Sequence, residues 1–168
     1  MVEYVTTRSL SNATDEAARL WAFSCAHYPK SHKILLDHAT RDIIDVVSSF
    51  ALNARRSMEI LPATRSFTLN QPRWHWEPGH HGELLTDFRQ ACNRIIHARQ
   101  LFVGFEDLRD SDAFIKDGTV IVPYVRAATD RFDLVFIDPF AMAYSFLYEV
   151  LPVLLELKTT VEKEGVGG

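Results

Sequence analysis

Apolar residues recur every three or four positions along two stretches of the first sixty residues. This spacing places the apolar side chains on one face of a helix, so each stretch predicts an amphipathic helix. The first helix is predicted to begin at Asn12 or Thr14, whose side chains can cap it, and to end before Pro29. The second is predicted over residues 31–61, because no Gly or Pro interrupts the pattern before Pro62.

The periodic pattern is lost after the second helix and then returns. Residues 62–82 contain three prolines and predict a long loop, a feature that is uncommon inside compact domains and often functional. Apolar residues at helical spacing resume after Gly82, so a third helix is predicted over residues 83–99.

Beyond residue 99 the pattern changes from helices to strands. Residues 100–106, 118–126 and 131–138 each predict a strand, with Gly118 in the turn before the second one. Pro123 cannot donate a hydrogen bond to a neighbouring strand, so the second strand is predicted to have an unpaired stretch or to lie at an edge. We expect a small three-stranded antiparallel meander.

The end of the chain predicts one more helix. Asp138 can cap it and Pro139 suits its first position, and the apolar pattern then continues to about Lys163. A kink is predicted at Pro152, which lacks a backbone N–H. Residues 164–168 are predicted to be a disordered tail. The fold class is therefore α+β, mainly a bundle of four helices with a long second helix and the meander between the third and last helices.

Composition limits the classes of protein that need to be considered. The 168 residues are 47% apolar, which is enough for a single domain spanning residues 1–168 with its own core. The net charge of −4 gives no overall attraction to nucleic acid, so any such contact must come from a local basic patch. Cys25 and Cys92 lie within helical patterns and are predicted to be buried free thiols. No segment resembles a secretion signal or a membrane span, so we expect a cytoplasmic protein without a membrane partner.

The third predicted helix carries the most specific chemical signal in the chain. Arg89, Asn93 and His97 recur every four residues, so on a helix they share one face. As a catalytic group, the guanidinium would hold a phosphate, the imidazole would transfer a proton near neutral pH, and the amide would orient the imidazole. The alternative is structural: His97 interacts with the carbonyl end of its helix, and Arg89 pairs with Asp87 or a neighbouring helix.

The segment CNRIIHA, residues 92–98, follows a long helix and resembles the HEPN superfamily of helical proteins. The shared motif is an arginine, four to six further residues, and a histidine. The resemblance covers about residues 31–99 and implies a homodimer with a composite, metal-independent ribonuclease site at the subunit interface. It also implies a place in a bacterial defence or toxin system, and the meander would be an addition to the family's helical core.

The chain departs from the family motif at the arginine. In the family, four to six residues lie between the arginine and the histidine. The positions at these distances before His97 hold Cys92, Ala91 and Gln90, and none of them is an arginine. Asn93 and His97 match the polar positions of the motif, and Arg89 or Arg94 would have to take the part of the arginine. A noncatalytic relative of the family is therefore the alternative.

Two further groups of residues are candidates for binding. Arg94, together with Arg55 and Arg56 on the second helix, could contact the RNA backbone, although Arg55 and Arg56 could equally be solvated side chains that pair with Glu59. The loop WHWEPGHH could hold a transition metal through nitrogen and oxygen ligands, or it could be a surface loop anchored by its tryptophans. Its candidate metal ligands are His75, Glu77, His80 and His81.

Three functions follow from these features. The leading one is a HEPN-like protein that binds RNA or cleaves it without a metal, acting as a homodimer and needing no cofactor. The second is a noncatalytic interaction module, such as an immunity or accessory factor with a protein partner. The third is a metal enzyme that uses the histidine loop.

Overall fold

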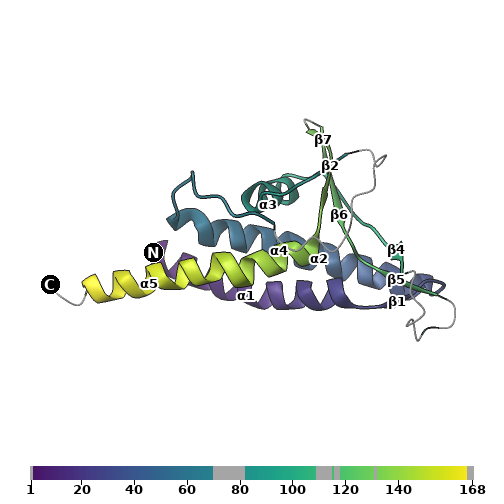
Figure 1. The fold of residues 1–168 in the computed structure, drawn as a ribbon, viewed down its shortest axis with the longest axis horizontal. Helices are drawn as coiled ribbons and strands as arrows, with labels where there is room; N and C mark the ends of the chain where they lie inside the picture. Colours follow the sequence, from purple (N-terminus) through teal and green to yellow (C-terminus); the bar gives the residue numbers. More distant parts are fainter. Residues whose placement is uncertain (1, 70–81, 109–114, 116–117, 131, 166–168) are drawn as a thin grey trace.

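The computed structural model describes residues 2–69, 82–108, 115, 118–130 and 132–165 (Figure 1). Its helical elements are α1 (Val2–Cys25), α2 (Lys33–Ser57), the 3-10 turn η1 (Met58–Ile60), α3 (Phe88–Ile96), α4 (Pro139–Ser145), the π-helical turn η2 (Phe146–Val150) and α5 (Leu151–Gly165). Its strands are β1 (Tyr28–Pro29), β2 (Glu83–Leu84), β3 (Gln100–Val103), β4 (Glu106–Asp107), β5 (Thr119–Ile121), β6 (Val125–Thr129) and β7 (Phe132–Ile137). The predicted α+β class is confirmed.

The long helices form one layer, and α3 and the sheets lie at one side and one end of it (Figure 1). Three fully buried aromatic rings join α2, α3 and η2, because Phe50 packs edge-on against both Phe88 and Phe146. The ring centroids are 6.1 and 5.4 Å apart, within the range of favourable aromatic pairs. This cluster anchors the beginning of α3 on the bundle.

The first helix is longer than predicted. It begins at Val2, so the predicted start at Asn12 or Thr14 is wrong. The Thr14 hydroxyl donates to the carbonyl of Leu10 at 2.8 Å, a bond made inside a helix and not at its cap. No Gly or Pro precedes Asn12 to stop the helix from extending towards the N-terminus.

The last helical segment, formed by α4, η2 and α5, begins as predicted and is irregular just before the position where a kink was predicted. The Asp138 carboxylate accepts hydrogen bonds from the backbone N–H groups of Phe140 and Ala141, at 2.8 and 3.2 Å, which confirms it as the cap. The distortion falls on the π-helical turn η2, just before Pro152, where the N–H of Leu151 bonds to the carbonyl of Phe146. Because Pro152 has no N–H, the preceding turn widens. The helix reaches Gly165, so its end is not disordered there; residues 166–168 lie outside the described part.

The last helical segment is also the most apolar part of the fold. By length and composition, Pro139–Thr160 could cross a membrane, contrary to the expectation that no segment would approach this length. The 18-residue window has a mean hydropathy of 1.5, and 39% of it is buried inside the fold. The core helix of a soluble protein passes the same test.

The predicted meander is present, and a second sheet lies beside it. Strands β3, β6 and β7 pair antiparallel, and the short strand β2 adds to β7 in parallel. The predicted strand over residues 118–126 is split at Pro123: β5 pairs with β1 and β4, whereas β6 joins the meander. The unpaired stretch predicted at Pro123 is therefore confirmed. Gly118 has a φ of +92°, as a turn residue requires.

The third helix is shorter than the predicted 83–99. Glu83–Leu84 pairs with β7 as a strand, and the Asp87 carboxylate then caps α3 by accepting from the N–H of Gln90 at 2.7 Å. His97 ends the helix, and its backbone N–H bonds to the carbonyl of Asn93 at 3.1 Å. This short helix lies on α2, close to the end of β6.

Candidate functional site

The two sides of α3 have different environments. The side that faces the bundle carries Phe88, Ala91, Cys92 and Ile95, which are all at most 3% exposed. The opposite side carries Gln90, Asn93, Arg94 and His97, which line a pocket. Each set follows the spacing i, i+3, i+4, i+7 of a single helical face. Packing of the first set therefore fixes where the second set points.

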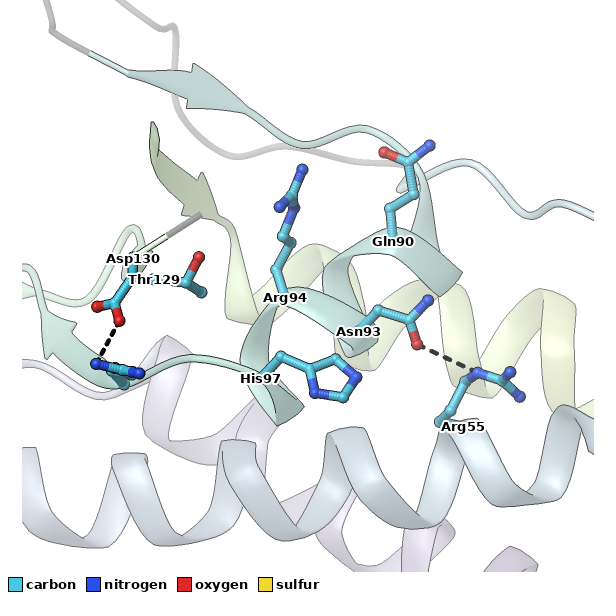
Figure 2. Close-up of a pocket in the computed structure, with 8 residues that line it drawn as sticks. Arg55, Gln90, Asn93, Arg94, His97, Thr129 and Asp130 are labelled. Carbon is cyan, nitrogen blue, oxygen red and sulfur yellow. Dashed lines mark hydrogen bonds and ion pairs between the residues drawn. The ribbon is translucent and has the colours of Figure 1, made fainter. Parts of the chain in front are cut away.

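The pocket has a volume of about 800 Å³ and is open to solvent (Figure 2). Besides the α3 residues, its described lining comes from α2 and from the two ends of the meander, with Arg55, Arg99, Thr129 and Asp130. Arg99 and Asp130 form an ion pair across the β3 and β6 ends. Three arginines thus face one carboxylate in the described lining, so the pocket is cationic although the whole chain is acidic.

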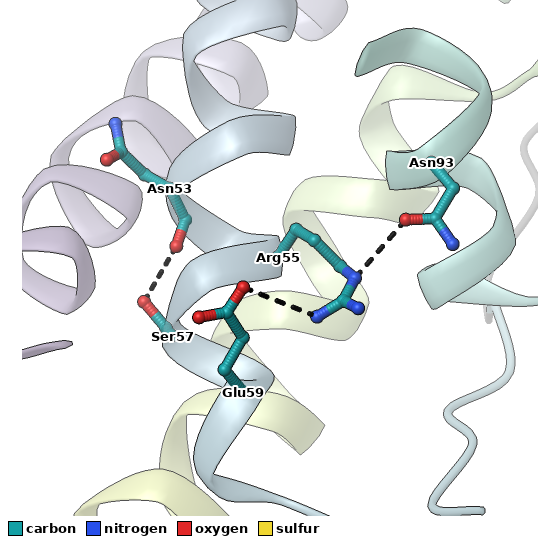
Figure 3. Close-up of polar contacts among 5 residues, drawn as sticks. All are labelled: Asn53, Arg55, Ser57, Glu59 and Asn93. Atoms are coloured by element: carbon teal, nitrogen blue, oxygen red, sulfur yellow. Dashed lines mark hydrogen bonds and ion pairs between the residues drawn. The ribbon is translucent and has the colours of Figure 1, made fainter. Parts of the chain in front are cut away.

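Arg55 holds the amide of Asn93 in place (Figure 3). Its Nε donates to the Asn93 Oδ1 at 3.2 Å, and its Nη1 lies 4.0 Å from the Glu59 carboxylate. The side chain is 30% exposed, so the contact forms at the pocket wall and not deep in the core. With the carbonyl oxygen turned to Arg55, the Asn93 NH₂ group is directed elsewhere as a donor.

His97 is the titratable group of the pocket best suited to proton transfer near neutral pH. Its side chain is exposed and lies beside Asn93 in the same pocket (Figure 2). The residue stands at the C-terminal end of α3, where backbone carbonyls favour a positive charge. Its position therefore fits proton transfer, and it also fits the structural alternative of a helix-end cation.

Arg89 does not share this pocket. It is half-buried and absent from the described lining, and its backbone stands eight residues from His97, about 12 Å along the helix axis. The pairing with Asp87 that formed its structural alternative is not among the ion pairs of the described residues. Of the predicted catalytic group, the structure brings together Asn93 and His97 and leaves Arg89 outside.

The three predicted binding arginines separate in the same way. Arg94 and Arg55 line the pocket, whereas Arg56 is exposed and outside its described lining. Sequence reasoning did not select four other lining residues, namely Gln90, Arg99, Thr129 and Asp130. Gln90 could have been found from its helical spacing to Asn93 and His97, but the other three depend on where the meander ends.

The two cysteines differ, and the prediction that both are buried is wrong for Cys25, which is exposed near the end of α1. Cys92 is fully buried, and this burial raises the pKa of its thiol well above the usual value. The nearby guanidinium groups of Arg55 and Arg89 act in the opposite direction and are outweighed by burial. Cys92 is therefore a protonated core residue and no nucleophile.

The proposed metal ligands His75, Glu77, His80 and His81 lie outside the described residues. Within the described part of the chain, no group of three or more His, Cys, Asp or Glu side chains could hold a metal ion. The metal hypothesis therefore stays a prediction about the loop alone.

Comparison with known proteins gave no match to a family model, a curated protein or a solved structure. The resemblance to the HEPN superfamily therefore stays a prediction based on the α3 motif.

Proposed function

We propose that the pocket on α3 binds the phosphodiester backbone of RNA and that His97 promotes its cleavage without a metal. The observation that carries the proposal is an exposed imidazole in a pocket with three guanidinium groups. The paired N–H donors of a guanidinium group match the non-bridging oxygens of a phosphate, and a neutral imidazole can accept a proton near neutral pH. The resemblance to HEPN ribonucleases points the same way.

The chemistry uses only groups of the pocket, the substrate and water. His97 accepts the proton of the ribose 2′-hydroxyl, whose oxygen attacks the neighbouring phosphorus. The new P–O2′ bond forms as the P–O5′ bond breaks, and the departing 5′-oxygen takes a proton from water. The protonated His97 returns its proton to the hydroxide left behind, which regenerates both the water and the neutral imidazole. The products are a 2′,3′-cyclic phosphate and a 5′-hydroxyl. Arg94, with Arg55 at the pocket wall, stabilises the charge on the phosphate oxygens in place of Arg89, which stands outside the pocket.

The test is cleavage of a labelled single-stranded RNA by the purified protein in the presence of EDTA. The wild type is expected to cut it and to leave 2′,3′-cyclic phosphate ends, whereas the 2′-deoxy version of the strand stays intact. His97→Ala should reduce the rate at least a hundredfold, in line with the loss of a proton-transfer group. Arg56→Met removes an exposed arginine outside the described lining and should leave the rate unchanged. Equal rates for wild type and His97→Ala would reject His97 as the base.

A second candidate function is a noncatalytic interaction module, and a partly exposed row of aromatic rings favours it. Trp21, Phe140, Tyr144 and Tyr148 are in successive ring contact along α1 and the last helical segment, and Tyr148 is 62% exposed. Such a surface fits a protein partner or the homodimer implied by the resemblance. Under this alternative, Tyr148→Glu abolishes assembly measured by light scattering, while His97→Ala changes nothing.

A further inference from the structure

Two guanidinium groups near the pocket have donors without acceptors. The Arg55 Nη1 is buried and makes no hydrogen bond, and the same is true of the Nε and Nη2 of Arg89 among the described residues. The Glu59 carboxylate is the acceptor nearest to Arg55, but at 4.0 Å it is beyond hydrogen-bond distance. Buried donors of a permanent cation are costly to leave unpaired, so these three nitrogens call for an anion.

The two arginines belong to one neighbourhood. Arg55 bonds to Asn93, and Arg89 stands one turn of α3 before Asn93 on the same side of the helix. Both guanidinium groups also act electrostatically on the buried thiol of Cys92. Arg55 also forms part of the pocket wall, through its contact with Asn93. Two like charges held near one point repel each other, and an anion between them would turn this repulsion into attraction. The arrangement therefore suits an oxyanion that accepts hydrogen bonds from both guanidinium groups.

We propose that Arg55 and Arg89 form a second phosphate-binding subsite next to the one at His97. The proposal rests on the proposed function and adds to it the substrate class, a single-stranded polynucleotide with at least two consecutive phosphates. Neither side chain is fully buried, and the proposal requires rotation about the last torsions to turn the unpaired donors towards the phosphate. The incoming phosphate then takes the place of the distant Glu59 carboxylate.

The spacing along α3 separates the two phosphates. Arg89 and His97 lie about 12 Å apart along the helix axis, which is more than one phosphate group spans. One phosphate is held near His97 and Arg94, and the next one between Arg55 and Arg89. A substrate with a single phosphate fills the first subsite only.

The test compares two short strands that lack the 2′-hydroxyl and so cannot be cut by the proposed chemistry. The dinucleotide dUpdU has one phosphate and the trinucleotide dUpdUpdU has two. Calorimetry at low salt should show the wild type binding the trinucleotide about tenfold more tightly. Arg89→Met keeps the apolar stem and should lower trinucleotide affinity to that of the dinucleotide, whose own affinity is unchanged. Arg56→Met, the matched control, should leave both affinities unchanged.

Each failure points to a different part of the account. If Arg89→Met weakens both strands equally, or neither, the second subsite is wrong while the pocket can still bind RNA. If the wild type binds neither strand, the proposed function fails together with the subsite.

Two readouts keep the proposal falsifiable if the variant affects folding. If Arg89 serves an empty phosphate site, Arg89→Met should raise the melting temperature of the free protein, because unpaired buried donors are removed. A purely structural role predicts a lower one. On the wild type alone, the logarithmic salt dependence of trinucleotide binding should exceed that of the dinucleotide by about 0.7, one extra phosphate contact. Equal slopes would overturn the second subsite.

Discussion

The two faces of α3 have the same helical spacing and opposite surroundings. The inner face is sealed against the bundle and includes Phe88 and Cys92, whereas the outer face opens into a pocket and includes Asn93 and His97. The inner residues stabilise the fold by leaving water. The outer residues add little to packing and are held by individual contacts, such as that of Arg55 with Asn93.

Under the proposed function, this difference separates the residues that hold α3 in the fold from those that meet RNA. Substitutions on the inner face should act on the free energy of unfolding and should affect RNA only through loss of the folded state. Substitutions on the outer face should act on RNA binding and leave unfolding almost unchanged.

The strongest challenge to the comparison is Phe88→Ala. Phe88 is fully buried, in ring contact with Phe50 and Phe146. We expect a loss of about 3–5 kcal/mol in the free energy of unfolding, measured by urea denaturation, because the missing ring leaves a cavity. A loss below about 1 kcal/mol would mean that this face is not the anchor of α3.

A smaller effect is expected on the outer face from Arg55→Met. The change removes the hydrogen bond to Asn93 and one guanidinium of the pocket, so RNA affinity should fall about tenfold, or about 1.4 kcal/mol. The free energy of unfolding should change by less than about 1 kcal/mol, since the side chain is 30% exposed. Arg56→Met is the control for the loss of charge. A similar loss of affinity in both variants would indicate a general charge effect and no defined pocket.

The smallest effect concerns thiol chemistry and pH. In the native protein a disulfide reagent should modify Cys25 and not Cys92, giving one reactive thiol per chain and two after unfolding. Because burial raises the pKa of Cys92 in the folded state, its contribution to stability is complete below about pH 9 and is lost as pH rises above that value.

Urea midpoints measured from pH 8 to pH 10 should therefore decline more steeply for wild type than for Cys92→Ala. Identical pH profiles, or two reactive thiols in the native state, would show that the inner face is open to water.

The sequence predicted most of the fold because its signals are local. Helical spacing located α2 and α3, the Asp138–Pro139 pair located the start of the last helix, and alternation located the meander. The start of α1 was wrong for a local reason, since nothing before Asn12 stops the helix, and other errors arose where distant contacts decide. Nothing near Pro123 shows that its two sides belong to different sheets.

The site was predicted in part for the same reason. The polar face of α3 is visible in the sequence, but a choice of every fourth residue gave Arg89, whereas the packed helix turns Gln90 and Arg94 into the pocket. The contributions of Arg99 and Asp130 come from the ends of strands and could not be read from a helical pattern.

The most direct test of the account is an NMR titration of the labelled protein with dUpdU, followed at each backbone amide of α3. If the pocket binds the strand, the largest shifts fall at Asn93, Arg94 and His97, and only small ones at Ala91 and Ile95 on the inner face. Unchanged signals along α3, or shifts confined to another surface of the protein, would contradict the claim that this pocket binds RNA.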